Sequence, residues 1–355
     1  MRKEDKMKRG FLWAAAAAAC LFLSGCAMGE ATGENTVAGN QALLEGSYEE
    51  ALTLFQKAAG QGETAVLALR GEGLAFMGLA RYEEAEKAFQ EALEAADDKM
   101  PENQKDIRLH LASAQFRQDK YEDAISTCNE ILDGETTDAD AYFIRGASSL
   151  FLGNDSDARK DFDAAAAAAP EDYDLFLNIY ECYVQISQSA VGNEYLERAL
   201  NITGEDAEHY YNRGRIYYYL GNYTEAESEL LVPVDEKYEP AMYLMGQVYL
   251  ALGDYARGGG IYQEIQSEFG ESASCYNGLA QCSIAEGNYD MALSYIAQGL
   301  ALEGNQGKQE LYFNEIVAYE KKLDFATAKT KAEEYVNRYP SDEAGQKEWE
   351  FLSTR

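Results

Sequence analysis

A short element recurs nine times along the 355-residue chain, and this repetition constrains the fold more than any other feature. The element has the form Gly-x-Tyr-x-x-Ala, and successive copies start 32 to 39 residues apart. Its aromatic position is filled by Tyr48, Tyr82, Tyr121, Asp155, Ser189, Tyr223, Tyr255, Tyr289 and Phe325. Three places later every copy has a small residue: Ala51, Ala85, Ala124, Ala158, Gly192, Ala226, Gly258, Ala292 and Ala328. Such self-similarity predicts a stacked array of one supersecondary unit.

Each copy of the repeat predicts two amphipathic helices. Within 207–238, Tyr210 and Tyr217 lie on one stripe of helical spacing, Gly221 interrupts it, and Tyr223 begins a second stripe. In seven units the first helix carries a small residue: Gly39, Gly73, Ala112, Gly146, Gly214, Gly246 or Ala280. We expect this residue to face the small residue of the second helix, so that the two axes approach closely. The aromatic stripes are therefore expected mainly in the core.

The best-preserved elements resemble the helix-turn-helix consensus of the tetratricopeptide repeat family. They are GNYTEA at 221–226 and GNYDMA at 287–292, and closing prolines follow at Pro170 and Pro340. The resemblance implies an all-α fold, an α-α superhelix (solenoid) of about nine helix-turn-helix repeats over 32–342. Units are expected near 32–65, 66–99, 105–138, 139–172, 173–206, 207–238, 239–271, 273–306 and 309–342. A capping helix is expected over 343–355, because an end repeat must cover its apolar face.

Three segments depart from the pattern. The unit at 173–206 has Ser, Ser and Tyr where Gly, Tyr and a small residue are expected. Pro233 and the run Gly258–Gly260 fall inside second helices, where they weaken helix structure. We therefore predict a soft joint across roughly 230–262. The longest gap between copies predicts an enlarged loop near 97–103.

Residues 1–25 are predicted to form a signal peptide. A basic start precedes an apolar run over 11–23, which is too short to span a bilayer as a helix. The sequence LSGC at 23–26 resembles the lipobox of bacterial lipoproteins, which implies a diacylglyceryl group on Cys26, the first residue of the mature chain. An ordinary signal peptide is the alternative. Residues 26–39 are expected to form a flexible tether to the extracytoplasmic face of the cell membrane. Gram type stays open.

The chain is strongly acidic. Its formal charge is −32, and removal of the first 25 residues leaves 25 basic and 60 acidic groups. Such a chain repels phosphate backbones, so a nucleic-acid function is excluded. The acids are spread along outer helical faces, which favours a role in solubility, although attraction of a basic partner stays open.

The sequence contains no motif for a cofactor, a metal ion or catalysis. His110 and His209 are its only histidines, and neither has ligands at metal-binding spacing. After the signal peptide and Cys26, four cysteines remain: Cys128, Cys182, Cys275 and Cys282. Cys275 and Cys282 are too far apart on one helix to pair. Buried free thiols are expected, with a distant pairing left open.

The family resemblance implies that the first helices line a groove in which a protein or peptide binds. The groove positions are occupied mostly by aromatic and aliphatic side chains. Few of them are charged, and Arg70 is one of these few. The candidate partner-binding residues are Tyr211, Arg215, Tyr218, Tyr219, Tyr243, Phe143, Leu150 and Phe116. Several of these rings alternatively pack against the next repeat. The Lys/Asn set with which some family members clamp a carboxylate tail is absent.

These observations favour a membrane-anchored, non-catalytic scaffold for protein–protein interaction at the bacterial cell envelope. The alternative is a surface lipoprotein that binds a polysaccharide or a small solute in its aromatic groove. An enzyme is a third possibility, which the missing motifs disfavour. The partner and the oligomeric state are not predicted.

Overall fold

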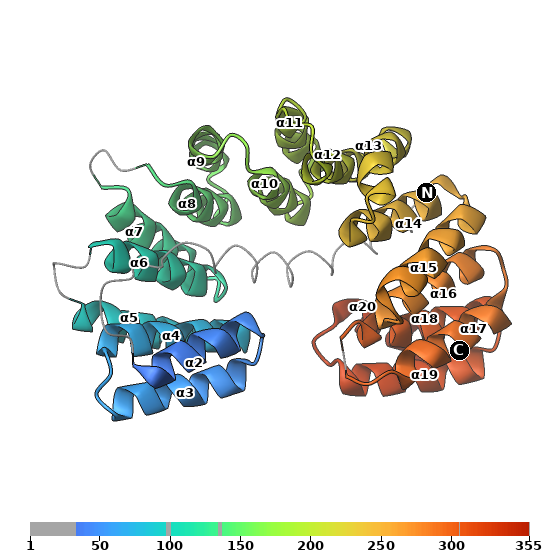
Figure 1. The fold of residues 1–355 in the computed structure, drawn as a ribbon, viewed down its shortest axis with the longest axis horizontal. Coiled ribbons are helices and arrows are strands. Elements are labelled where there is room, and N and C mark those ends of the chain that lie inside the picture. Colours follow the sequence, from blue (N-terminus) through green and yellow to red (C-terminus); the bar gives the residue numbers. More distant parts are fainter. Residues whose placement is uncertain (1–32, 97–100, 134–136, 305, 355) are drawn as a thin grey trace. The chain divides into compact units, whose positions relative to one another are not determined.

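The computed structural model describes residues 33–96, 101–133, 137–304 and 306–354 (Figure 1). Within these residues all regular structure is helical, in 19 helices, which confirms the predicted all-α solenoid class. The helices form two compact units, divided between Arg198 and Ala199. The predicted signal peptide, Cys26 and the first half of the tether, 26–32, lie outside the described residues. The second half of the tether is not a free linker, because 34–39 form the start of the first described helix.

Unit 1 comprises five consecutive helical hairpins. Its helices are α2 (Glu34–Leu44), α3 (Tyr48–Gly60), α4 (Ala65–Gly78), α5 (Tyr82–Ala95), α6 (Pro101–Phe116), α7 (Tyr121–Ile131), α8 (Ala139–Phe151), α9 (Asp155–Ala168), α10 (Tyr173–Gln185) and α11 (Ser189–Ala199). The last residue of α11 is the first residue of unit 2.

Unit 2 comprises four hairpins and a final single helix. Its helices are α12 (Ala207–Leu220), α13 (Tyr223–Asp235), α14 (Glu239–Leu252), α15 (Tyr255–Phe269), α16 (Ala273–Ala285), α17 (Tyr289–Ala301), α18 (Lys308–Lys321), α19 (Phe325–Arg338) and α20 (Glu343–Ser353). The final helix covers the end of the last hairpin, where Leu352 is buried and Trp349 packs against the same core cluster.

One turn geometry joins the two helices of every hairpin. Two residues before each repeat aromatic, the backbone has a positive φ, at Gly46, Ala80, Asp119, Gly153, Ser187, Gly221, Gly253, Gly287 and Leu323. This left-handed residue ends the first helix and lets its last carbonyls be paired. After α12, for example, the Gly221 amide donates to the Tyr218 carbonyl at 3.0 Å. The recurrent Gly of the sequence element is thus a helix-ending turn residue.

The small residues of the first helices approach those of the second helices as expected, with Gly246 O 3.6 Å from a Cβ built at Gly258, and they also accommodate large side chains, which was not predicted. A Cβ built at Gly39 would lie 2.8 Å from the Phe55 ring, and one at Gly246 would lie 2.5 Å from Tyr262. Phe55 and Tyr262 come four residues after the small residue of the second helix. On its other side each ring meets a glycine of the next first helix, such as Gly278 for Tyr262. Each ring therefore joins two successive hairpins.

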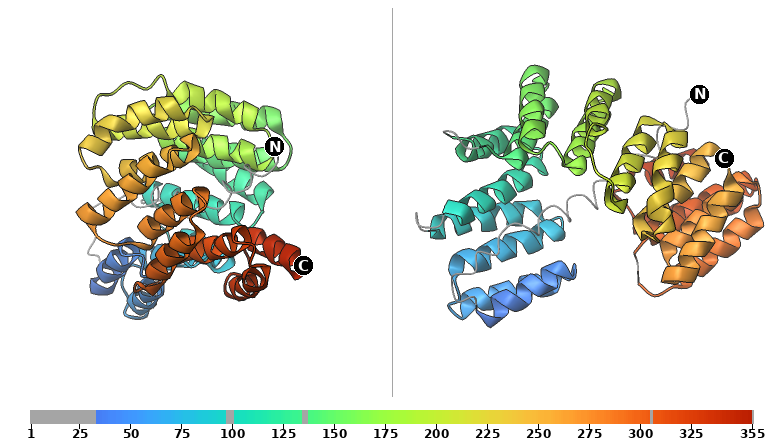
Figure 2. Two further views of the ribbon diagram at one scale, coloured as in Figure 1. Left: turned by 90° about the vertical axis from the view of Figure 1, so that its right-hand side faces the viewer. Right: turned by 45° about the horizontal axis from the view of Figure 1, so that its top comes forward.

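First helices and second helices form separate layers within each unit (Figure 2). In unit 1 the first helices α2, α4, α6, α8 and α10 contact one another in series, and in unit 2 α12, α14, α16 and α18 do the same. Among the described residues, no second helix contacts the next second helix to a comparable extent. The first helices are therefore crowded and the second helices are splayed, so the first-helix face of each unit is its concave face.

Part of the predicted enlarged loop at 97–103 is helical. Helix α6 begins at Pro101, four residues before the predicted start of its unit, because proline fits the first turn of a helix, where its missing amide is not needed. The helices also continue through the predicted soft joint: α13 extends past Pro233 to Asp235, and α15 is unbroken at Gly258–Gly260. The division into units falls at 198/199 instead. A soft joint at 230–262 stays a prediction about dynamics.

Cys128, Cys182, Cys275 and Cys282 are buried free thiols, as expected. Burial raises the pKa of the Cys128 and Cys282 thiols to about 12, so both stay protonated at neutral pH. A distant disulfide among these four residues is therefore absent from the structure.

Candidate partner-binding surface

Helix α12 carries four of the predicted groove residues. Its start is fixed by Asp206, whose carboxylate accepts a hydrogen bond from the His209 amide at 2.7 Å, and its end by the left-handed Gly221. As a first helix, α12 belongs to the concave face of unit 2. The helix is therefore held at both ends by its own sequence, which gives its side chains a fixed direction.

Arg215 and Tyr211 form a cation–π pair on α12. The guanidinium carbon lies 5.6 Å from the centroid of the Tyr211 ring, and the same guanidinium donates a 2.8 Å hydrogen bond to Asn212. The Tyr211 ring also meets Tyr238 edge-on at 5.2 Å. The pair is half-buried and oriented, so a partner would find these groups already ordered.

Three further tyrosines gather at the end of α12. The Tyr218 ring lies 5.6 Å from Tyr219 and 5.6 Å from Tyr223, and all three are half-buried. Burial raises the pKa of Tyr218, so its phenol stays protonated at physiological pH. The cluster offers apolar ring area with neutral polar tips, which is the chemistry of strong protein interface anchors.

Tyr243 on α14 is fastened to the neighbouring hairpin. Its hydroxyl lies 2.9 Å from Ser272 Oγ and 3.0 Å from Cys275 Sγ, and its ring lies 6.3 Å from Tyr262. Burial, followed by the contact with Cys275, raises the pKa of Tyr243. Its polar tip is therefore already used inside the protein. No single-sequence pattern indicated these partners.

The remaining predicted residues lie in unit 1. Phe116 packs against Tyr121 and Phe151, at 5.5 and 5.7 Å between ring centroids, and Phe143 lies 6.0 Å from Phe162. Leu150 is 2% exposed and belongs to the core, so its assignment to the binding surface was wrong. Phe116 thus packs within its own hairpin and against the next one, whereas the contact of Phe143 with Phe162 lies within a single hairpin.

The first helices of unit 1 carry more charge than predicted. Arg70 on α4 forms an ion pair with Asp106 on α6, in which Arg70 Nη2 donates a 3.0 Å hydrogen bond to Asp106 Oδ1. His110 Nε2 lies 3.5 Å from the same carboxylate oxygen. Burial alone would raise the pKa of Asp106, but His110 and Arg70 outweigh it and hold that pKa well below its usual range. Lys105 pairs with Asp138 at 2.6 Å. This face is polar as well as aromatic.

These ion pairs could have been predicted from the sequence by looking for residues of opposite charge that are one repeat length apart. Arg70 and Asp106 are 36 residues apart, and Lys120 and Glu86 are 34 apart and bonded at 2.7 Å. Residues separated by one period occupy equivalent places on adjacent hairpins, so they come within reach of each other.

Other kinds of site are not found in the part of the chain that the structure describes. No group of three His, Cys, Asp or Glu side chains there could hold a metal ion. No helix among those residues is long and apolar enough to cross a membrane.

Helical hairpins stacked in series, with a concave first-helix face, define the class of α-helical solenoid proteins. Tetratricopeptide repeat family models match residues 70–140, 207–231 and 240–272, so the chain contains tetratricopeptide repeats. This fold is typically a protein- or peptide-binding module, and proteins built from it are generally non-catalytic scaffolds.

Several solved structures are similar. A tetratricopeptide repeat protein from Parabacteroides merdae is 17% identical, with a TM-score of 0.45 over 72% of this chain and 98% of that chain. YrrB, described as having an unusual peptide-binding site, is 22% identical, with a TM-score of 0.37 over 48% and 84%. MamA from Desulfovibrio magneticus is 17% identical, with a TM-score of 0.40 over 48% and 97%. No curated protein matches the sequence significantly.

Proposed function

We propose that this protein is a lipid-anchored, non-catalytic scaffold that binds a protein partner at the bacterial cell envelope. The observation that carries the proposal is the ordered tyrosine and arginine cluster on the concave face of unit 2, around Tyr211, Arg215 and Tyr218. Tyr and Arg are, with Trp, the residues enriched among interface anchors, because they bury a large area and keep a polar tip. The partner would bury these rings between α12 and α14.

The anchoring is inferred from the residues at the start of the chain. A basic start, an apolar run and the LSGC sequence at 23–26 are typical of lipoprotein export and lipid attachment at Cys26. Electrostatics supports a covalent anchor, because a chain of net charge −32 is repelled by an anionic lipid surface. Two or more acyl chains would hold it stably.

Partner binding is tested by cross-linking and affinity capture from the cells' own membranes. We expect a defined protein to be captured by the native chain, and Tyr211→Ala and Tyr218→Ala each to weaken capture about tenfold or more. Phe269→Ala is the matched control, because this aromatic is exposed at the end of a second helix and its loss should leave capture unchanged. Equal capture by all four proteins would contradict the proposal.

Anchoring is tested separately. Cys26→Ser should leave the lipid off the chain and move the protein from the membrane fraction to the soluble fraction. Mass spectrometry of the native N-terminus should show a lipid-modified cysteine. A native chain without lipid would refute the anchor and leave the scaffold proposal standing.

A further inference from the structure

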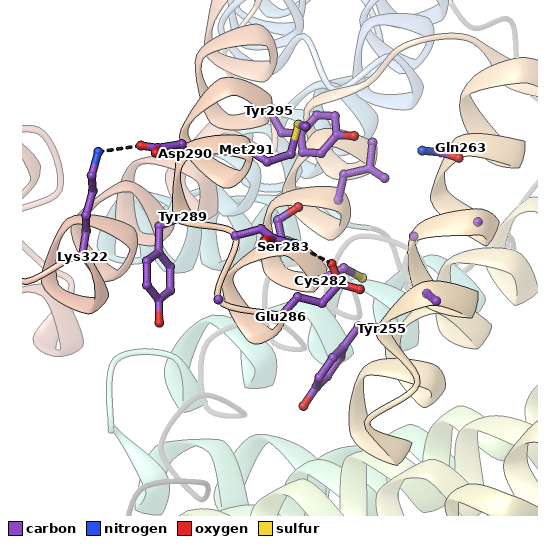
Figure 3. A pocket seen from close by; sticks show the side chains of 16 residues that line it. Tyr255, Gln263, Cys282, Ser283, Glu286, Tyr289, Asp290, Met291, Tyr295 and Lys322 are labelled. Atoms are coloured by element: carbon purple, nitrogen blue, oxygen red, sulfur yellow. Dashed lines mark hydrogen bonds and ion pairs between the residues drawn. The ribbon is translucent and has the colours of Figure 1, made fainter.

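A hollow of about 700 Å³ opens between the second helices α15 and α17, over the end of α16 (Figure 3). Its volume falls within the roughly 300–1,000 Å³ typical of small-molecule sites. The hollow lies entirely within unit 2 and belongs to the splayed second-helix layer, so it is distinct from the first-helix surface described above. Its rim is exposed at Gln263, Glu286 and Asn288.

Gly259 and Gly260 of α15 leave room for the hollow, although no neighbouring atom requires glycine at either position. Gly258 is closely packed, because a Cβ there would lie 3.1 Å from Cys282 Sγ. At Gly259 and Gly260, by contrast, an added Cβ would meet no atom within 4 Å. Each glycine costs about 1 kcal/mol relative to alanine in a helix interior. The fold would therefore accept larger residues at these two positions, and their side chains would fill the space.

The end of α16, the first helix that follows α15, also leaves this space open. In unit 1 the repeat aromatic Tyr121 stacks on Phe151, with ring centroids 5.5 Å apart. The equivalent pair in unit 2 is Tyr255 and Ala285, because each second residue comes 30 positions after the first. Alanine cannot cover the ring as phenylalanine does. Neither Tyr255 nor Tyr289 has an aromatic ring partner among the described residues.

Ser283 supplies a hydroxyl that makes no hydrogen bond inside the described protein. Its side chain lines the hollow and is only 7% exposed, yet its hydroxyl makes no hydrogen bond to any described residue. The Ser113 and Ser148 hydroxyls, also on first helices, donate to carbonyls four residues earlier at 2.9 and 2.8 Å. The Ser283 hydroxyl is thus left available toward the hollow, where it can donate a hydrogen bond to a ligand and accept one from it.

The charges around the hollow disfavour an anionic ligand. Its one cation, Lys322, is paired with Asp290 at 2.5 Å, as Figure 3 shows. Glu286 is left with a hydrogen bond from the Asn288 amide at 3.1 Å and no basic partner in the lining. The remaining polar side chains of the lining, Gln263, Ser283 and three tyrosines, are neutral and can both donate and accept.

We propose that this hollow binds a neutral carbohydrate, one sugar unit of a longer glycan. A sugar ring has apolar C–H faces, which would pack on the Tyr255 and Tyr289 rings. Its hydroxyls both donate and accept, which matches the Ser283 hydroxyl, the Gln263 amide and the Glu286 carboxylate. The open rim lets a glycan chain continue on either side of the bound unit. The site is separate from the scaffold surface and does not depend on it.

The test is a calorimetric titration of the purified full-length protein with three neutral oligosaccharides: maltohexaose, cellohexaose and the hexamer of N-acetylglucosamine. We expect at least one to bind with one site per chain. Gly259→Leu should abolish that binding by filling the hollow, and Ser283→Ala should weaken it about tenfold. Neither change should lower the thermal midpoint, because Gly259 is unpacked and the Ser283 hydroxyl has no partner in the protein.

Gly60→Leu is the matched control, because an added Cβ at Gly60 of α3 also meets no atom within 4 Å. Its binding should equal that of the native chain. The proposal is overturned if none of the three sugars binds at millimolar concentration, or if Gly259→Leu binds as well as the native protein. It is also overturned if tetramethylammonium binds in place of sugar, since the tyrosines would then form a cation site. Tyr211→Ala should not alter sugar binding, which separates this result from the scaffold test.

Discussion

Four of the nine hairpin turns place a side chain where the backbone favours glycine. Ala80, Asp119, Ser187 and Leu323 all have φ near +60°, a region that costs a residue with a Cβ about 1–2 kcal/mol. Asp119 recovers part of this cost by accepting a 2.6 Å hydrogen bond from the Tyr121 hydroxyl. Leu323 is 73% exposed and has little packing to compensate. Strain at the turns is thus unevenly distributed.

We predict that Leu323→Gly stabilises unit 2 by about 1 kcal/mol, because it removes the left-handed strain and loses almost no buried area. The free energy of unfolding in urea measures the effect. Gly287→Ala, at the equivalent turn of the preceding hairpin, should destabilise by a similar amount. If both changes shifted stability in the same direction, the turn strain inferred from φ would be refuted.

The carboxylate of Glu63 caps the start of α2. It accepts hydrogen bonds from the Thr36 hydroxyl (2.6 Å), the Thr36 amide (2.9 Å), and the amide and side chain of Asn35. The side-chain bond from Thr36 is the largest cause that lowers the pKa of Glu63 from its usual value to about 2. The charged form is therefore favoured in the folded state.

Because the pKa of Glu63 is lower in the folded state than in the unfolded state, its charged form stabilises the fold. This contribution is fully present above the unfolded pKa and is lost as the pH falls toward the folded pKa. We predict that Glu63→Gln lowers the stability of unit 1 at pH 7. The difference from the native chain should shrink between about pH 4.5 and pH 2. Urea unfolding at pH 7, 5, 4 and 3 checks this. A difference that stays constant over this range would show that the charge of Glu63 is not the cause.

At the scale of the helix, the aromatic side chains fix how close successive hairpins lie. Tyr262 occupies the space between Gly246 and Gly278, and Phe55 lies between Gly39 and Gly71. We predict that Gly278→Ala destabilises unit 2 by about 1–3 kcal/mol, because its Cβ would overlap the Tyr262 ring. This loss should exceed the gain from alanine's higher helix propensity.

Gly259→Ala on α15 is the counterpart, because its Cβ points into open space. Here only helix propensity changes, and we expect stabilisation of up to about 1 kcal/mol. Thermal unfolding of both variants compares them directly. Opposite signs are expected, and a loss of stability in both would mean that helix packing around the two glycines is not as the structure describes.

The sequence specified the elements better than their contacts. The period located the hairpins, because turn glycines and apolar stripes are local signals. It did not reveal that Gly39 meets the Phe55 ring, or that Leu150 is buried, since both depend on which helix lies opposite. Proline chemistry rather than periodicity set the start of α6 at Pro101. The cluster at Tyr211 was found because its members share one helix, whereas the contact of Tyr243 with Cys275 joins two hairpins.

At the scale of the whole molecule, contacts are local in sequence and cluster into two units divided at 198/199. In such an array each hairpin is stabilised mainly by its neighbours, so a defect in one unit should spread over only a few hairpins.

We predict that Phe89→Ala, which empties a fully buried site in unit 1, lowers stability there by about 3–5 kcal/mol. Hydrogen exchange should then speed up in α4–α6 and stay unchanged in α16–α18. Ile316→Ala, a fully buried site on α18, should give the reverse pattern with a loss of about 2–5 kcal/mol. Faster exchange in both units from either variant would mean that the array unfolds as one cooperative body.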